Sequence, residues 1–310
     1  MLYNNLLEAI GNTPLVKLNK MVSPDMADIY VKYEGLNVGG SIKTRTALAM
    51  IEQAEKNGLL TKDSIIVEPT SGNQGIGLSL IGALKGYKVK IIMPDSVSVE
   101  RKKLCEHYGA EVILVHDNND IGEAMDMCIK LSLKMKQENS NVCVPGQFQN
   151  IANVVIHRDV TAKEILNDCP TKIDGFCSGI GTGGTLSGIG ETLKKANPEC
   201  VVWALEPEKA AMLSNGKLES HLQMGIGDGI IPEILDKSII DDIKVIKDDE
   251  AVFIAQMAAR LEGFMCGITS GTNIIGAMML ARKLGKGHTV VTILPDTGER
   301  YFSTPLFSLD

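Results

Sequence analysis

The sequence lacks the features that mark several large classes of protein. No apolar run approaches about eighteen residues, so we expect no transmembrane helix. No basic residue precedes an apolar stretch near the N-terminus, so we expect no signal peptide. Basic side chains are in deficit, with 31 Lys and Arg against 38 Asp and Glu and a net charge of -7. This balance disfavours nucleic acid or an anionic membrane as a partner, and we expect a cytoplasmic protein.

Metal-binding patterns are missing as well. The seven cysteines and five histidines are scattered, with no C-x-x-C pair and no H-E-x-x-H motif. An odd, dispersed set of cysteines disfavours a disulfide framework and a zinc ribbon. We therefore expect no structural metal.

Short apolar strands alternate with longer amphipathic helices along the 310 residues, of which strand 29–34 followed by helix 43–56 is one example. Such pairs indicate βαβ units, and the length suits an α/β fold of two lobes with mostly parallel twisted sheets flanked by helices. We place the larger lobe at residues 1–42 plus 145–310 and the smaller lobe at residues 43–144. Ligands bind beyond the carboxyl ends of such strands, so the loops there should carry the function.

The loop Gly179-Ile-Gly-Thr-Gly-Gly-Thr185 lies between an expected strand and an expected helix. Its glycines let a ligand approach the backbone, and the helix start offers free N–H groups, so the loop predicts a phosphate site. It also satisfies G-x-G-x-x-G, and Glu206 ends the next expected strand. A nicotinamide-dependent oxidoreductase is therefore an alternative, as is a tight turn without a ligand.

Lys43 begins an expected helix within Gly39-Gly-Ser-Ile-Lys43-Thr-Arg45. The helix dipole opposes a cation at this position. The same field, with partial desolvation, would lower the pKa of the lysine and favour a neutral amine able to form a Schiff base. The alternative is an ordinary surface lysine.

Two further loops carry hydroxyl and amide groups at expected helix starts. The loop Pro69-Thr-Ser-Gly-Asn-Gln-Gly75 suits a substrate carboxylate, because backbone N–H groups and hydroxyls meet there. The loop Cys266-Gly-Ile-Thr-Ser-Gly-Thr272 precedes a helix expected at 272–284. Simple helix capping is the alternative for both loops.

Pyridoxal phosphate is a cofactor that would use all four loops, since it needs a lysine, an anion site and hydrogen bonds to its ring. Together with Ile10-Gly-Asn-Thr-Pro-Leu15 and Gly298-Glu-Arg-Tyr301, these motifs make the chain resemble the cysteine synthase (O-acetylserine sulfhydrylase) and cystathionine β-synthase family. The resemblance covers nearly the whole chain. It implies the tryptophan synthase β-like fold of fold-type II pyridoxal-phosphate enzymes, a homodimer and a small amino-acid substrate. We expect the smaller lobe to close over the substrate, because it carries the loop for the substrate carboxylate whereas the phosphate loop lies on the larger lobe.

The resemblance also implies a role for each loop residue. Lys43 would form the Schiff base and move the Cα proton, Asn73 would bind the cofactor's 3′ oxygen, and Thr269 would face the pyridine nitrogen. A neutral hydroxyl there would favour β-elimination and β-replacement over transamination. The phosphate would be held by Gly181, Thr182, Gly183, Gly184 and Thr185. The substrate would be bound by Thr70, Ser71, Gly72, Gln74, Gln147 and Gly227.

The sequence departs from the family's usual pattern at several positions, including Val38 and Thr44 of the lysine loop, where proline and aspartate are usual, and two positions in the loops for the substrate. Gln74 stands where a threonine is usual, and Asp228, within Gly225-Ile-Gly-Asp-Gly229, stands where a small residue is usual. A carboxylate in this loop would repel an incoming sulfide anion and could act as a general base for water. The hypothesis is that L-cysteine and water give L-serine and hydrogen sulfide through an aminoacrylate, with Asp228 activating the water.

Three alternatives stay open at this point. Asp228 would in the simplest case only cap a glycine-rich turn. The protein would then be a cysteine synthase, a transferase that makes cysteine and acetate from O-acetylserine and sulfide. A member of the family that binds the cofactor without turnover is the third alternative.

Overall fold

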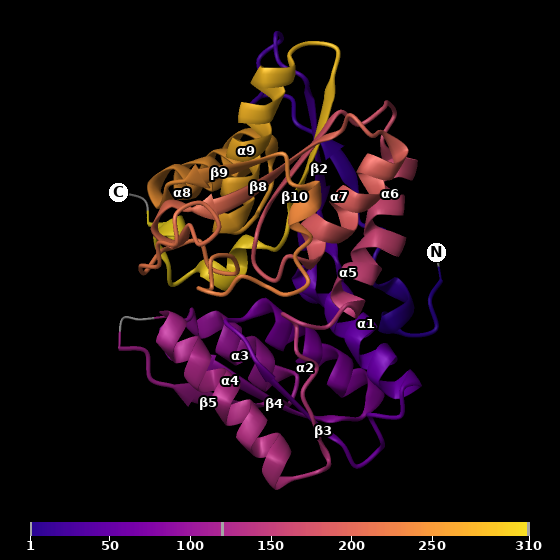
Figure 1. Cartoon of the computed structure of the whole chain (residues 1–310), viewed down its shortest axis with the longest axis vertical. Coiled ribbons are helices and arrows are strands. Elements are labelled where there is room, and N and C mark those ends of the chain that lie inside the picture. Colours follow the sequence, from indigo (N-terminus) through magenta and orange to yellow (C-terminus); the bar gives the residue numbers. More distant parts are fainter. Residues whose placement is uncertain (1, 119–120, 309–310) are drawn as a thin grey trace.

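The computed structural model describes residues 2–118 and 121–308, which form two lobes, each built on its own sheet (Figure 1). The six-stranded sheet has the order β1-β2-β10-β7-β8-β9, and the four-stranded sheet has the order β5-β4-β3-β6. Every neighbouring pair is parallel except β1 with β2. In the described ranges no helix is both long enough and apolar enough to cross a membrane.

The larger sheet carries helices on both faces because its central strands are apolar on both sides. In β10, Val290 and Leu294 join one buried cluster, whereas Val291 and Ile293 join the cluster on the opposite face. Alternate residues of a strand point to opposite faces, so this continuous apolar run is typical of a doubly covered parallel strand. The strands of this sheet are β1 (Leu15–Lys17), β2 (Asp28–Tyr33), β7 (Gly175–Gly179), β8 (Val201–Pro207), β9 (Asp242–Ile246) and β10 (Thr289–Leu294).

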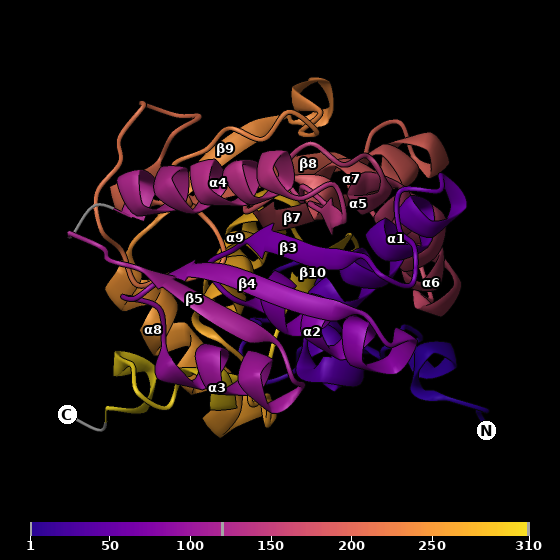
Figure 2. The same ribbon diagram turned by 90° about the horizontal axis from the view of Figure 1, so that it is seen from below.

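One face of the larger sheet is covered by helices α8 (Asp248–Met257) and α9 (Ile268–Leu284). The other face is covered by α6 (Ala162–Asp168) and α7 (Gly184–Ala196) (Figure 1). The smaller sheet is covered in the same way. Figure 2 shows α4 (Ile121–Glu138) on one side of it and α2 (Asn73–Lys85) and α3 (Val99–His107) on the other. Its strands are β3 (Ile65–Pro69), β4 (Lys88–Pro94), β5 (Glu111–Val115) and β6 (Val142–Cys143), and α1 (Lys43–Lys56) packs beside α2.

The structure differs from the expected elements in two places near the site. Helix α9 begins at Ile268 and not at residue 272, so the expectation that the whole 266–272 segment is a loop is wrong. Gly271 lies inside the helix, where a Cβ atom would come within 1.9 Å of the Ala251 carbonyl oxygen, so this glycine serves close packing on α8. The second difference is a continuous helical segment that was not expected, made of α5 (Ala152–Ile156), π-helical residues His157–Thr161 and α6.

Candidate active site

A cavity lies beyond the carboxyl ends of β3, β7 and β10, and its wall is built by residues of both lobes. This is the place where ligands bind in open parallel sheets. Gly72, Gly184 and Gly227 do not line the cavity, but each adjoins a residue that does. The other predicted site residues all line it: Lys43, Thr70, Ser71, Asn73, Gln74, Gln147, Gly181, Thr182, Gly183, Thr185, Asp228 and Thr269.

Lys43 is the first residue of α1, and its Nζ atom donates a hydrogen bond to Thr182 Oγ1 at 3.2 Å. Burial lowers the pKa of Lys43 to about 8, although the negative charges of Asp228 and Glu68 act in the opposite direction. A lysine with such a pKa has an appreciable neutral fraction near neutral pH, which a nucleophilic amine requires.

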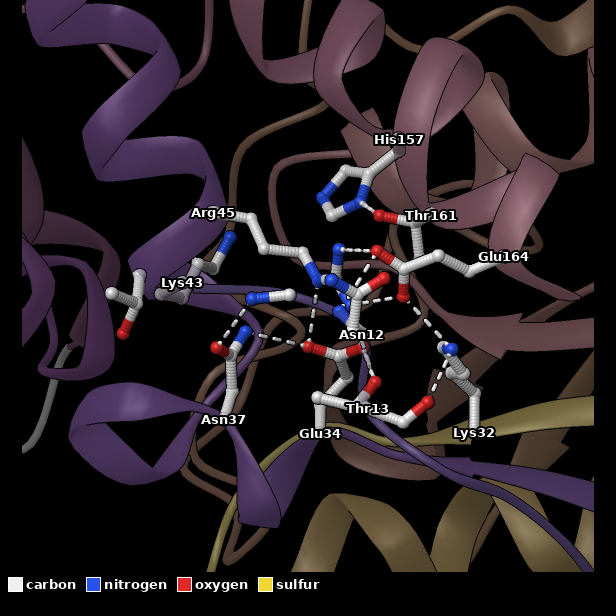
Figure 3. Close-up of polar contacts among 12 residues, drawn as sticks. Asn12, Thr13, Lys32, Glu34, Asn37, Lys43, Arg45, His157, Thr161 and Glu164 are labelled. Atoms are coloured by element: carbon white, nitrogen blue, oxygen red, sulfur yellow. Dashed lines mark hydrogen bonds and ion pairs between the residues drawn. The ribbon is translucent and has the colours of Figure 1, made fainter. Parts of the chain in front are cut away.

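Arg45, two residues after Lys43, joins the start of α1 to two carboxylates, those of Glu34 and Glu164 (Figure 3). With Lys32 these residues form a largely buried charge network. The Arg45 guanidinium donates to both carboxylate oxygens of Glu34, at 2.9 and 3.0 Å, and of Glu164, at 2.7 and 2.6 Å. Lys32 approaches the same Glu164 at 2.8 Å. Burial alone would raise the pKa of Glu164, but hydrogen bonds and charge from Arg45, with help from Lys32, lower it to about 2. The network therefore stays ionised and fixes the backbone that carries Lys43.

The glycine-rich loop after β7 could not hold larger residues. A Cβ atom on Gly181 would lie 2.3 Å from the Gly225 carbonyl oxygen, and one on Gly184 would lie 2.2 Å from Asn153 Oδ1. Gly183 has φ +79°, a conformation that favours glycine. The hydroxyl-bearing residues Thr182 and Thr185 line the cavity where α7 begins. Free N–H groups at a helix start together with hydroxyls suit a phosphate group.

The loop after β3 is held from behind by Arg101 of α3. Its Nη1 atom donates to the Ser71 carbonyl oxygen at 2.9 Å, and its side chain fills the space that a Cβ atom on Gly72 would need. Gln74, in the first turn of α2, is 1% exposed and its Oε1 atom accepts from Thr46 Oγ1 at 2.6 Å. Its Nε2 atom is buried without a hydrogen-bond partner within the described chain. A buried donor at a cavity wall needs an acceptor, and a ligand carboxylate is one group with the chemistry to supply it.

Asn73 and Thr269 lie on the same cavity at the starts of α2 and α9. Asn73 Nδ2 donates to Asp296 Oδ2 at 2.6 Å, and its Oδ1 atom accepts from Arg300 at 2.8 Å. One hydrogen of this amide stays available for a ligand. Thr269 Oγ1 donates to the Met224 carbonyl oxygen at 3.2 Å, and the hydroxyl oxygen keeps its capacity to accept.

Asp228 lies in another glycine-rich loop at the cavity, residues 225–229. Gly225, Gly227 and Gly229 have φ of +101°, +68° and +75°, so only glycine fits comfortably at these three positions. None of residues 2–118 and 121–308 donates a hydrogen bond to the Asp228 carboxylate or forms an ion pair with it. The carboxylate therefore does not cap the turn. Asp228 lines the same cavity as Lys43, and its charge acts on the Lys43 amine.

Comparison with known proteins identifies the family. The sequence model of the family of pyridoxal-phosphate dependent enzymes matches residues 6–296 of this chain. The chain belongs to this family. It is 46% identical to a cysteine synthase from Staphylococcus aureus over 308 aligned residues. The alignment covers 99% of this chain and 98% of the relative.

Two solved structures are similar to this pyridoxal-phosphate enzyme over nearly its full length. One is a hydrogen sulfide-producing enzyme from Fusobacterium nucleatum, at 42% identity and a TM-score of 0.91, with 97% of this chain and 100% of that chain covered. The other is an aspartate-to-asparagine variant of a hydrogen sulfide-producing enzyme in complex with an α-aminoacrylate intermediate, at 36% identity and a TM-score of 0.92, with 98% and 92% covered. These matches confirm the expected resemblance, the fold-type II α/β class and the cofactor.

The cavity of this family member fits pyridoxal phosphate. A lysine of lowered pKa can bind an aldehyde, the loop from Gly181 to Thr185 is a cradle that Cβ atoms would fill, and the Asn73 amide retains a free hydrogen. When bound, the cofactor supplies an electron sink that acidifies the Cα proton of an amino acid.

The oxidoreductase alternative is wrong for this pyridoxal-phosphate enzyme. Glu206, expected there as the ribose-binding acid, is 4% exposed. Its carboxylate accepts from the backbone N–H groups of Leu213 and Ser214 at 2.7 and 3.0 Å and from the Ser214 hydroxyl at 2.6 Å. The acid at the end of this strand therefore closes a local loop.

Several residues that support the site were not predicted from the sequence. Glu68 accepts from the N–H groups of Gly146 and Gln147, both at 2.9 Å, and so fixes the segment that carries Gln147. Asn153 Nδ2 donates to the Gln147 carbonyl oxygen and to Thr182 Oγ1, both at 2.9 Å. A buried carboxylate at the end of strand β3 was a signal available in the sequence, whereas the position of Asn153 depends on the unexpected helical segment 152–168.

Proposed function

We propose that this enzyme converts L-cysteine and water to L-serine and hydrogen sulfide, with Asp228 as the general base for water. The observation that carries the proposal is the Asp228 carboxylate, which lines the Lys43 cavity with no hydrogen-bond donor or ion-pair partner among the described residues. A carboxylate that is not used by the fold can take a proton from a water molecule. Its charge also opposes the approach of a hydrosulfide anion, the nucleophile of a synthase.

The chain's own residues then have distinct tasks. The substrate carboxylate binds to the hydroxyls of Thr70 and Ser71 and to the amides of Gln74 and Gln147, all of which line the cavity. The neutral Lys43 amine takes the proton from Cα, and the bond from Cβ to sulfur breaks as hydrosulfide leaves.

Asp228 next removes a proton from water while the water oxygen forms a bond to Cβ. Lys43 returns its proton to Cα, which completes L-serine, and the proton held by Asp228 passes to hydrosulfide. The net change is one water consumed and one hydrogen sulfide released, with no oxidant or reductant.

Support for this reaction also comes from the two similar structures of hydrogen sulfide-producing enzymes, one of which carries an aspartate-to-asparagine change together with an α-aminoacrylate intermediate. The second candidate is cysteine synthesis from O-acetylserine and sulfide, which is favoured by the 46% identical Staphylococcus aureus cysteine synthase. The two candidates share Lys43 and the cofactor, and they differ in the nucleophile that adds at Cβ.

The test supplies L-cysteine alone to the purified enzyme in heavy-oxygen water and measures both sulfide and the carbon product by mass. Labelled serine in equal amount to sulfide supports the proposal. Pyruvate and ammonia, or little turnover of cysteine with fast cysteine formation from O-acetylserine and sulfide, would contradict it.

Asp228→Asn should lower the rate of serine formation by about a hundredfold or more, since general-base catalysis contributes roughly that much. The matched control is Asp126→Asn, on the exposed surface of α4, which should leave the serine rate unchanged. Equal serine rates for Asp228→Asn and the wild type would show that another group activates water.

A further inference from the structure

His221 contacts the loop that carries Asp228 at the residue just before it. The His221 Nε2 atom lies 3.1 Å from the Gly227 carbonyl oxygen. The Gly227 N–H group donates to the Ile180 carbonyl oxygen, also at 3.1 Å, so both sides of this residue are held. The fit is close, because a Cβ atom on Gly227 would lie 3.0 Å from His221 Nε2.

The proton on the His221 ring is placed by its second contact. The Gln223 backbone N–H donates to His221 Nδ1 at 3.1 Å, so Nδ1 is an acceptor and the proton resides on Nε2. In this tautomer Nε2 donates to the Gly227 carbonyl oxygen. Both ring nitrogens are occupied, and His221 is therefore not itself a base for water.

The histidine rests on a rigid support. Gln223 is fully buried, and its Nε2 atom donates to the Ile246 carbonyl oxygen at 3.0 Å and to Asp248 Oδ1 at 2.9 Å. Its Oε1 atom accepts from the Thr272 hydroxyl of α9 at 2.7 Å. The start of α8 and the first part of α9 thus fix Gln223, which in turn fixes the ring of His221.

We infer that His221 is a positioning residue that sets the place of the Asp228 carboxylate in the cavity through the Gly227 carbonyl group. The inference rests on the proposed function, in which Asp228 activates water. A base must lie within hydrogen-bond reach of the proton that it removes, so a small displacement of a glycine-rich loop lowers water addition without changing the earlier release of sulfide. His221 therefore controls the ratio of serine to pyruvate. An intermediate to which no water is added breaks down to pyruvate and ammonia.

Two substitutions separate the contacts of the ring. In His221→Asn the side-chain oxygen can take the place of Nδ1 and keep the bond from Gln223, but the donor to Gly227 is lost. In His221→Gln the amide nitrogen can reach the position of Nε2 and keep the donor to Gly227. We expect the serine-to-pyruvate ratio to fall about tenfold in His221→Asn, the effect of losing one hydrogen bond, and to stay near the wild-type value in His221→Gln.

The experiment measures sulfide, serine and pyruvate from L-cysteine for the cofactor-loaded enzyme and both variants. His107→Asn, the same substitution at an exposed position on α3, is the control and should match the wild type. An unchanged product ratio in His221→Asn, or equal falls in both His221 variants, would overturn the inference.

Asp228→Asn is measured alongside to separate this inference from the proposed function. A shift of the ratio in Asp228→Asn but not in His221→Asn would overturn the positioning role alone. No shift in Asp228→Asn would overturn both, because His221 is proposed to act through that carboxylate.

Discussion

Asn73 and Asp296 meet across the cavity, where Asn73 Nδ2 donates a 2.6 Å hydrogen bond to Asp296 Oδ2. Asn73 begins α2 beside the smaller sheet, and Asp296 follows β10 of the larger sheet. The residue predicted to bind the cofactor's 3′ oxygen is thus oriented by the opposite lobe. A second contact joins the lobes behind it, since Arg101 Nη2 donates to the Tyr301 hydroxyl at 2.8 Å. Any closing movement of the smaller lobe, which stays a prediction, would have to keep or exchange these hydrogen bonds.

The buried network around Arg45 yields a prediction on stability. In Arg45→Met the carboxylates of Glu34 and Glu164 lose their main partner, and the Glu34 side chain is fully buried. Leaving a buried charge without its partner costs about 3–5 kcal/mol, so the free energy of unfolding should fall by that amount. Urea unfolding of the cofactor-loaded protein measures it.

The control for Arg45→Met is Lys195→Met, which removes one partner of the more exposed Lys195–Glu191 pair. Such surface pairs contribute about 0–1 kcal/mol. Similar losses of stability in the two variants would show that the network around Arg45 does not stabilise the start of α1 as argued.

Glu68 gives a prediction on the pH dependence of stability. Burial raises its pKa from 4.5 to about 7, although the N–H groups of Gln147 and Gly146 and the charge of Lys43 oppose this. Between pH 4.5 and about pH 7, the folded protein therefore binds more protons than the unfolded chain. The stability that protonated Glu68 contributes is present at low pH and is lost as the pH rises toward 7.

Relative to Glu68→Gln, the wild type should therefore lose about 2 kcal/mol of unfolding free energy between pH 5 and pH 7. Lys43 does not disturb this window, because the cost of its lowered pKa is constant below about pH 8 and changes with pH only above that value. Urea unfolding of both proteins at the two pH values checks the result. Parallel pH profiles would mean that Glu68 ionises in the folded protein as it does in the unfolded chain.

The sequence was most informative where a single local signal decides the structure. Helix α1 begins at Lys43 as predicted, and α2 and α7 begin at Asn73 and Gly184, inside the two loops where helices were expected to start, because glycine-rich loops separate clear strands from clear helices there. Helix α9 was placed four residues too late, since Gly271 can be a turn residue or a packing residue, and only the neighbouring α8 decides between them.

Supporting residues of the site were harder to predict because their partners are distant in the chain. The contacts of Glu68 with Gly146 and of Asn73 with Asp296 join segments that only the folded topology brings together. The Gln147 prediction came from family resemblance. An acid in the apolar strand β3 is visible in the sequence, but that Glu68 holds Gln147 is not, because the two residues are far apart in the chain. The expected division of the chain at residues 43 and 145 and the homodimer stay predictions.

Gln74 gives a prediction on substrate affinity, because this chain has glutamine where the family usually has threonine. Its buried Nε2 atom has no partner in the part of the chain described, while Thr46 donates to its Oε1 atom. Gln74→Glu keeps the acceptor for Thr46 but replaces the free donor by a negatively charged oxygen that faces the substrate carboxylate. The KM for L-cysteine should rise about tenfold to a hundredfold, the value of a charge-assisted hydrogen bond. Steady-state kinetics measures this, with Gln137→Glu on the exposed side of α4 as the control for added charge. An unchanged KM in Gln74→Glu would mean that the amide points away from the substrate when it binds.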